Sequence, residues 1–336
     1  MKTSRRNFIS KSILATAGIS AGLNSIIKAD SNKAYTTGFP VLPLAKDKDA
    51  FRISIFSKHL HWLDYNEMAA VSADMGFDGL DLTVRPGGHV LPERVEEDLP
   101  KAMEAVRKRG LNIYMITTGI NDAGDPLSEK ILKTAASLGI HHYRMGYMHY
   151  SDAISVEENI TSIQLRLSKL AELNSKYSVS GEYQNHSGIA AEGIYFGASV
   201  WDLAAALKSI NSKWLGSQYD IFHATVEGAN AWPVGLKLIF PYVRSIDIKD
   251  YIWLKKDGKW SSETVPLGEG MVNYKKYLGL LKQLNFNGPL SLHYEYPLGG
   301  AEHGATVLTM KREDVLSAMK KDLETLKRIL AESKLI

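Results

Sequence analysis

Four short segments in the second half of this 336-residue chain carry side chains that could bind a metal ion or move a proton. Each follows an apolar run with the composition of a β-strand: Glu182-Tyr-Gln184-Asn-His186, Asp220-Ile-Phe-His223, Asp247-Ile-Lys249-Asp250 and His293-Tyr-Glu295. Carboxylate, amide and imidazole groups are common ligands of divalent ions. A barrel of strands and helices collects such groups at one rim, so the pattern indicates a site for a divalent ion and a polyhydroxy ligand.

The first segment places three polar side chains on one face of a predicted strand. Residues two apart on a strand share a face, so Glu182, Gln184 and His186 are expected to point the same way. A hydrogen-bond network at a barrel mouth would explain them equally well, because buried polar groups are commonly paired.

Asp220 is expected at a strand exit, with His223 in the following loop. This spacing suits a carboxylate ligand and a substrate-binding imidazole. An Asp before a helix is, however, more often its N-cap than a metal ligand.

The last two segments repeat the alternation. Asp247 and Lys249 share one face of a strand, and His293 and Glu295 share one face of another. An inward Asp costs several kcal/mol unless it is paired or metal-bound, so an Asp247–Lys249 ion pair is the structural alternative.

The elements that must position these groups alternate between apolar strand-like runs and amphipathic helical patterns from Phe51 onward. Strands are expected at residues 52–56, 79–84, 111–117, 141–146, 179–186, 216–221, 243–249 and 290–296. Helices are expected at residues 67–75, 100–108, 127–138, 156–176, 200–210, 232–240, 274–284 and 312–331. Eight units predict an α/β fold, a single (β/α)8 TIM barrel. The rival, an open Rossmann sheet, is disfavoured because no Gly-x-Gly-x-x-Gly run follows the first strand.

The chain resembles the sugar phosphate isomerase/epimerase family of the xylose isomerase-like TIM barrel superfamily, over roughly residues 51–330. The motifs that carry the resemblance are Gly76-Phe-Asp-Gly-Leu-Asp-Leu, Gln184-Asn-His-Ser-Gly, Asp220-Ile-Phe-His, Ile246-Asp-Ile-Lys-Asp, Pro266-Leu-Gly-Glu-Gly and Ser291-Leu-His-Tyr-Glu. Members hold one divalent ion with Glu, Asp, His and Glu from the last four strands, and two of those acids also move the substrate proton.

The resemblance implies one ligand set for a divalent ion (manganese, magnesium, zinc or cobalt): Gln184, Asp220, Asp247 and His293. This set departs from the family pattern because it has two carboxylates instead of three, and Glu182 or Glu295 could restore one. Gln184 also weakens a mechanism with two glutamates, since an amide cannot act as a base.

Three residues are then the available proton carriers: Glu295, His186 and Lys249, with His293 as an alternative to Glu295. The residues expected to bind the substrate are His223, Arg144, His59, Trp62, Arg85 and Glu182. The structural alternatives are a place in an exposed loop for His59 and Trp62, loop anchoring for Arg85 and pairing with an acid for Arg144.

The N-terminus reads Ser4-Arg5-Arg6-Asn7-Phe8 and continues into an apolar stretch of small residues, which is typical of a twin-arginine export signal. We expect a signal at residues 1–29, a linker at 30–49, a barrel at 50–336 and a periplasmic location. The chain has no Cys, which excludes disulfides and thiolate metal sites. Its 40 Lys and Arg exceed its 37 Asp and Glu by only three, which argues against a nucleic-acid partner.

These observations predict a metal-dependent enzyme that abstracts a proton beside a carbonyl of a sugar or keto-sugar derivative. The outcome would be isomerisation, epimerisation or elimination, as from a 3-keto glycoside. The alternatives are a non-catalytic sugar-binding barrel and a metal-dependent phosphodiester hydrolase. The expected partner is a small-molecule sugar, with no nucleic acid and no membrane after signal removal, and a homodimer is a possible assembly.

Overall fold

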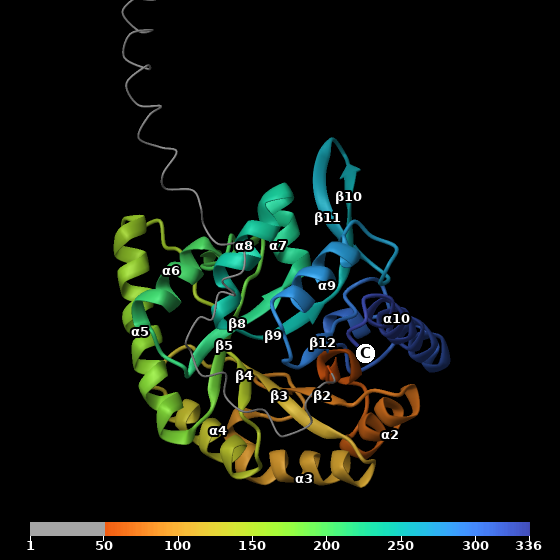
Figure 1. The fold of residues 1–336 in the computed structure, drawn as a ribbon. Helices are drawn as coiled ribbons and strands as arrows, with labels where there is room; N and C mark the ends of the chain where they lie inside the picture. Colours follow the sequence, from red (N-terminus) through yellow and green to blue (C-terminus); the bar gives the residue numbers. More distant parts are fainter. Residues whose placement is uncertain (1–50) are drawn as a thin grey trace, which may run out of the picture. The chain divides into compact units, whose positions relative to one another are not determined.

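Eight parallel strands close into a barrel in residues 51–336, the part of the chain that this computed structural model describes (Figure 1). They are β1 (Ile53–Phe56), β2 (Gly79–Val84), β3 (Asn112–Thr118), β4 (His142–Arg144), β5 (Ser180–Gln184), β8 (Leu215–Asp220), β9 (Val243–Ile248) and β12 (Leu290–Leu292). The first strand pairs in parallel with the last, which closes the barrel. The predicted TIM barrel is confirmed, and the predicted signal and linker lie outside the described residues.

The helices lie around the outside of the barrel (Figure 1). They are α2 (Tyr65–Met75), α3 (Val95–Lys108), α4 (Pro126–Ser137), α5 (Val156–Tyr177), α6 (Trp201–Ile210), α7 (Ile221–Gly228), α8 (Trp232–Ile239), α9 (Tyr274–Gln283) and α10 (Arg312–Glu332). Short 3-10 helices occupy Ser57–Leu60, Pro92–Arg94, Ala229–Ala231, Phe240–Tyr242 and Ala301–His303. No helix within residues 51–336 has the length and apolarity needed to span a bilayer.

Local sequence signals explain where several helices begin and end. Ser155 and Glu158 form a capping box at the start of α5. Asp220 caps α7 by accepting the backbone N–H of His223 at 3.2 Å, so the N-cap alternative for Asp220 is confirmed. Gly76, which follows α2, has a left-handed φ of 95°, as expected for a helix end.

Several strands are shorter than predicted, and this changes how four site residues are placed. β5 ends at Gln184, β9 ends at Ile248 and β12 ends at Leu292, so His186, Lys249, His293 and Glu295 all lie beyond the ends of these strands. Strand alternation therefore does not govern the direction of these four side chains. The inference that His293 and Glu295 share a strand face was wrong in its premise, although both reach the barrel mouth.

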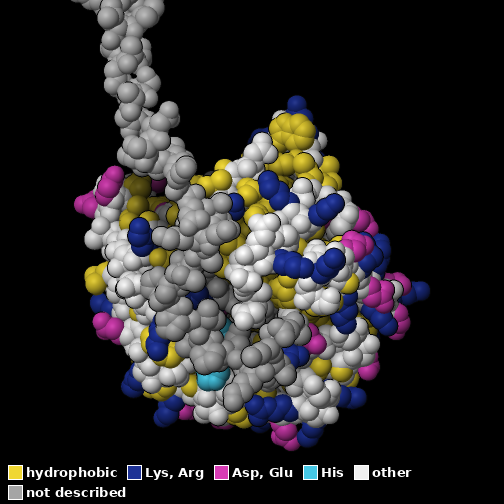
Figure 2. Space-filling model, viewed as in Figure 1, with side chains coloured by type: hydrophobic (Ala, Val, Ile, Leu, Met, Phe, Trp, Pro, Cys, Tyr) yellow, Lys and Arg dark blue, Asp and Glu magenta, His cyan; other side chains and the backbone are white. Residues whose placement is uncertain are grey.

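A hairpin of β10 (Asp250–Lys256) and β11 (Lys259–Val265) was not predicted. Its turn is Asp257-Gly258, with φ of 49° and 80°, a dipeptide that strongly favours two-residue hairpin turns. Figure 2 shows hydrophobic side chains near its tip, where Trp260 is 64% exposed. A second small hairpin joins β6 (Ile189–Ala190) and β7 (Gly193–Ile194).

The Pro266-Leu-Gly-Glu-Gly run folds back onto Asp250, the residue that starts the β10 hairpin. The buried Asp250 carboxylate accepts backbone N–H groups from Gly268, Gly270 and Val272, each at 3.1 Å, and from Tyr251 at 2.9 Å. A Cβ at Gly270 would lie 2.1 Å from the Asp250 carboxylate, so only glycine fits there. Asp250 is therefore a structural residue that fixes the loop beside the barrel mouth.

Replacing Asp250 with Ala should lower the free energy of unfolding by about 3 kcal/mol, because it leaves several buried N–H groups without an acceptor. Urea unfolding followed by circular dichroism measures the change. Glu269→Ala is the matched control in the same loop, since Glu269 only pairs with Lys321 on the surface and its loss should leave the midpoint unchanged. Equal effects of the two substitutions would refute the role given to Asp250.

Candidate active site

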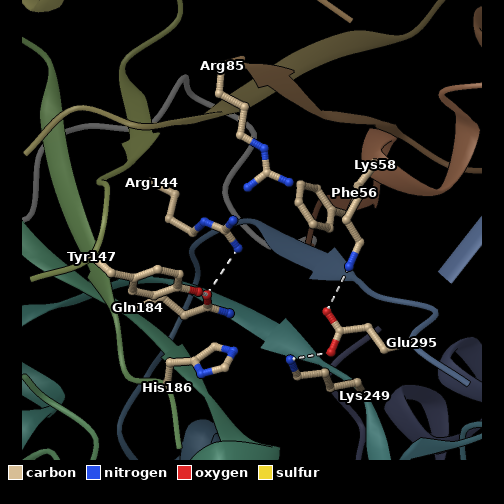
Figure 3. A pocket seen from close by; sticks show the side chains of 9 residues that line it. All are labelled: Phe56, Lys58, Arg85, Arg144, Tyr147, Gln184, His186, Lys249 and Glu295. Carbon is tan, nitrogen blue, oxygen red and sulfur yellow. Dashed lines mark hydrogen bonds and ion pairs between the residues drawn. The ribbon is translucent and has the colours of Figure 1, made fainter. Parts of the chain in front are cut away.

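A cavity of about 150 Å³ opens at the carboxyl ends of the barrel strands, where TIM barrels build their sites (Figure 3). It is lined by Phe56, Lys58, Arg85, Arg144, Tyr147, Gln184, His186, Lys249 and Glu295. Most of these side chains are charged or polar, and several point into the same space (Figure 3). The cavity is smaller than the roughly 300–1,000 Å³ of drug-sized pockets, which suits a ligand of monosaccharide size.

The Lys249 ammonium is the most heavily contacted group of the site. It lies 3.1 Å from the Asp220 carboxylate, 2.9 Å from the Glu295 carboxylate and 2.9 Å from His223 Nε2. These three partners match the three hydrogens that an ammonium can donate. Burial lowers the pKa of Lys249, but the Asp220 and Glu295 charges outweigh it and raise the pKa overall, so Lys249 stays charged.

Asp220, rather than Asp247, is thus the ion-pair partner of Lys249 on the neighbouring strand. Asp220 and Asp247 are register partners on β8 and β9. Lys249 lies two residues beyond Asp247, at the rim, and it reaches sideways to Asp220. The Asp247–Lys249 pair suggested as an alternative is therefore not the pair that forms.

Glu295 is held by two lysines. Lys58 lies 3.1 Å from one of its oxygens, and Lys249 contacts the other. Burial raises the pKa of Glu295, but the Lys249 and Lys58 charges outweigh it and bring the pKa well below the ordinary value. Glu295 is therefore a carboxylate with both oxygens engaged, which makes it a weak base.

The orientation of Gln184 is set by its neighbours. Its amide oxygen accepts hydrogen bonds from Arg144 Nη1 at 3.0 Å and from the Tyr147 hydroxyl. Its amide nitrogen consequently faces the two carboxylates, at 3.0 Å from Asp220 and 2.5 Å from Asp247. The reverse orientation would place the amide hydrogens against the Arg144 cation.

Both carboxylate oxygens of Asp247 accept hydrogen bonds from amide groups of the protein. One oxygen accepts from the Gln184 amide, and the other accepts from the Gln218 amide at 2.6 Å. His293 Nε2 lies 3.3 Å from Asp247. Burial lowers the pKa of His293, but the nearby Asp247 charge outweighs it, so the pKa is raised overall.

The four residues expected to hold a divalent ion do come together, but their arrangement does not fit one. Gln184 presents its amide hydrogens rather than its oxygen to both carboxylates, so in this orientation it cannot act as a metal ligand beside them. The Lys249 ammonium already lies beside Asp220. Within residues 51–336 no cluster of three or more His, Cys, Asp or Glu is arranged to hold a metal ion.

His186 is the imidazole of the cavity lining, and within the described residues its Nε2 has no protein partner. Nδ1 lies 2.8 Å from the Ser187 carbonyl oxygen and must donate to it, so Nε2 carries the lone pair. Burial and the Lys249 charge lower the pKa of His186 to about 3, so the ring is neutral near pH 7. His186 Nε2 is therefore available to accept a proton or hydrogen bond from a ligand.

Two guanidinium groups stand on the opposite side of the cavity (Figure 3). Arg144 ends β4 and Arg85 follows β2, and their charged groups lie 5.1 Å and 5.7 Å from the centre of the Phe56 ring. Burial and the nearby Arg144 charge lower the pKa of Arg85 to about 10. Both residues line the cavity, as predicted for substrate-binding groups.

The other predicted substrate-binding residues do not line the cavity. Glu182 is buried deeper in the barrel, where its carboxylate is hydrogen-bonded to His142 and Ser245. It is therefore part of a structural hydrogen-bond network, the alternative to a substrate-binding role. His223 lies behind His186, with ring centroids 3.9 Å apart.

His59 and Trp62 also lie away from the cavity, in the turn after β1. His59 accepts the Tyr294 N–H at 3.0 Å and contacts the Ala301 carbonyl at 3.1 Å, which fastens this turn to the last loop. Trp62 donates to the His59 carbonyl at 3.0 Å and packs against Arg312. Their contacts are those of loop anchors, and the exposed-loop alternative is wrong for His59, which is fully buried.

Three cavity residues were missed by sequence reasoning: Phe56, Lys58 and Tyr147. Phe56 is the last residue of β1, Lys58 is two residues further on, and Tyr147 is three residues beyond β4. Attention to every strand exit, rather than to carboxylate and imidazole groups alone, would have found them.

Residues 69–325 match the xylose isomerase-like TIM barrel family, and this chain belongs to that family. No match is found among curated protein sequences. D-Allulose 3-epimerase from Methylomonas sp. has a similar structure, with 15% identity and a TM-score of 0.61 over 84% of this chain and 99% of that one. So does 3-keto-D-glucoside 4-epimerase from E. coli, with 14% identity and a TM-score of 0.60 over 83% of this chain and 99% of that one.

A third similar structure is a xylose isomerase-like TIM barrel protein from Mycobacterium smegmatis in complex with magnesium. It shares 15% identity and a TM-score of 0.57 over 81% of this chain and 98% of that one. At such low identities these similarities show the fold alone. The chemistry of the site follows from the geometry of this chain's own residues.

The donor arrangement predicts that the protein has no stoichiometric divalent ion after purification. Elemental analysis measures this directly. Dialysis against EDTA, followed by addition of Mn²⁺ or Mg²⁺, should leave the midpoint of thermal unfolding unchanged, because a ligand that does not bind the folded state cannot stabilise it.

Gln184→Glu is the matched variant for this prediction. It places a third carboxylate beside Asp220 and Asp247, which favours a cation between them, so Mn²⁺ should raise its unfolding midpoint. One ion per chain retained by the unaltered protein through gel filtration, with a lower midpoint on its removal, would contradict our interpretation.

Proposed function

We propose that this chain is a sugar isomerase or epimerase that removes a proton beside the carbonyl of a keto sugar. Two findings support the reaction class: membership of the xylose isomerase-like family, and a fold shared with D-allulose 3-epimerase and 3-keto-D-glucoside 4-epimerase. The observation that carries the proposal is His186 Nε2, a proton acceptor without a protein partner in the described part of the chain, in a cavity that also contains the Lys58 and Lys249 ammonium groups.

In the proposed reaction His186 Nε2 takes the proton from the carbon beside the carbonyl. The C–H electron pair forms a carbon–carbon double bond, and the carbonyl oxygen takes up the negative charge. Lys58 is placed to stabilise that charge, since within residues 51–336 it donates only to Glu295. The three partners of Lys249 occupy its hydrogens, so it acts as a fixed positive charge rather than as a proton carrier.

The product depends on where the proton returns. Delivery by His186 to the former carbonyl carbon, with the hydroxyl proton of the adjacent carbon passing to the former carbonyl oxygen, gives an aldose–ketose isomer. Delivery of a solvent proton to the opposite face of the original carbon, with His186 releasing its own proton to solvent, gives an epimer. Expulsion of a leaving group one carbon further on would instead be the elimination considered for a 3-keto glycoside. All three begin with the same proton transfer. The divalent ion expected from sequence is not used, because the residues do not fit it.

His186→Gln should lower kcat by about 10²–10⁴-fold, the usual loss when a general base is removed. The assay incubates keto sugars and 3-keto glycosides with the protein in D2O and follows deuterium at carbon by NMR. His303→Gln is the control, because this exposed histidine lies outside the cavity and its loss should leave the rate unchanged.

Two results would count against the proposal. Turnover of a sugar without deuterium uptake in substrate or product would argue against proton exchange during the reaction. Equal rates in His186→Gln and the unaltered protein would remove His186 from it. A non-catalytic sugar-binding barrel would bind a sugar in calorimetry yet exchange no deuterium.

We also propose that the protein is exported to the periplasm by the twin-arginine route and assembles as a homodimer. The support for export is the Arg5-Arg6 pair and the apolar stretch that follows, and the dimer remains a prediction. Replacing both arginines with Lys should shift the full-length protein from the periplasmic to the cytoplasmic fraction. Periplasmic recovery that is unchanged by this substitution would refute the route, and light scattering on the exported protein tests the dimer.

A further inference from the structure

Arg85 and Arg144 are the two cavity cations without a carboxylate partner. Within residues 51–336 no Asp or Glu lies within ion-pair distance of either guanidinium, whereas Lys58 pairs with Glu295 and Lys249 pairs with both Asp220 and Glu295. The cavity lysines are therefore paired with carboxylates at contact distance, whereas the arginines interact with carboxylates such as Asp81 and Glu295 only beyond ion-pair distance.

Arg144 is the more deeply buried of these two arginines. It is only 5% exposed, its Nε has no hydrogen-bond partner, and its one side-chain hydrogen bond goes to the neutral Gln184 oxygen. A buried N–H donor without a partner is unfavourable, so Arg144 Nε is available to a hydrogen-bond acceptor supplied by a bound group.

The two guanidinium groups are also brought close to one another. Both lie within 6 Å of the centre of the Phe56 ring, at 5.1 Å for Arg144 and 5.7 Å for Arg85, and both project toward the cavity (Figure 3). Like charges held side by side repel, and an anion between them would convert this repulsion into two attractive contacts.

We infer that Arg85 and Arg144 form a subsite for an anionic group carried by the sugar, a carboxylate or a phosphate. The inference rests on the proposed function and defines its substrate class. A planar guanidinium donates two parallel hydrogen bonds to either group, and the Phe56 ring supports both arginines from one side.

The position of the subsite orients the substrate. His186 and Lys249 face the cavity from the side opposite Arg85 (Figure 3). A sugar with its acidic end at the arginines therefore presents its other end to His186, where the proton is removed. The cavity volume of about 150 Å³ suits one short sugar.

The test compares the binding of matched ligands by isothermal titration calorimetry. The probes are D-fructuronate, D-fructose 6-phosphate and D-fructose, which share a ketose and differ in the charged group. At least one anionic probe should bind about 10–100-fold more tightly than D-fructose, as expected for charge-assisted hydrogen bonds. Preference for the uronate identifies a carboxylate, and preference for the phosphate ester identifies a phosphate.

Arg85→Gln should remove most of this preference by weakening the binding of the anionic probes far more than the binding of D-fructose, and Arg85→Lys should restore part of it. Arg94→Gln is the control, because Arg94 is an exposed arginine on the outside of the barrel that pairs with Asp98. Unfolding midpoints confirm that each variant is folded. Arg144→Gln serves as a second test of the same subsite.

Equal affinities for the three probes, or a preference that survives Arg85→Gln, would overturn the inference. These binding readouts are independent of turnover. Anion-dependent binding without deuterium exchange would refute the proposed reaction but support the anion subsite. Deuterium exchange of neutral sugars without a preference for anionic ones would support the reaction but refute the subsite.

Discussion

The site depends on the buried ammonium of Lys249 and its two carboxylate partners. Asp220 and Glu295 come from different parts of the barrel rim, and each would be costly to hold near the interior without a positive charge beside it. The ion pairs fix the loop after β12 against β8 and β9. They also keep Glu295 ionised and engaged, which leaves His186 as the open proton acceptor of the cavity.

The ion pairs of Lys249 also help to explain why the site departs from the metal-binding pattern expected for the family. Where relatives are expected to have Glu, His and Glu, this chain has Gln184, Asp247 and either His293 or Glu295. The Gln184 amide donates to both Asp220 and Asp247, and Lys249 pairs with Asp220, so groups of the protein itself satisfy these two carboxylates. The barrel mouth is a hydrogen-bonded and ion-paired network in which protein cations occupy the role that a divalent ion would have.

Much of the architecture could be predicted from the sequence. β2 was expected at residues 79–84 and is found there, and the convergence of Gln184, Asp220, Asp247 and His293 followed from strand order. The β10–β11 hairpin was not predicted, although Asp257-Gly258 is a strong turn signal. Of the residues that form it, only the first, Asp250, was considered, as part of a polar segment.

The details of the site could not be predicted, because they depend on groups far apart in sequence. The direction of the Gln184 amide is set by Arg144 and Tyr147, and the choice of Asp220 by Lys249 depends on the register between β8 and β9. Alternation along one strand gives the face of a side chain but says nothing about its partner on the next strand.

The most direct test of the central claim is a crystal structure from crystals soaked in Mn²⁺, with data collected near the manganese absorption edge. Our account predicts electron density for the Lys249 ammonium between Asp220 and Glu295, and no anomalous peak within bonding distance of Asp220 and Asp247. A strong anomalous peak coordinated by those two carboxylates, with Lys249 displaced, would contradict it.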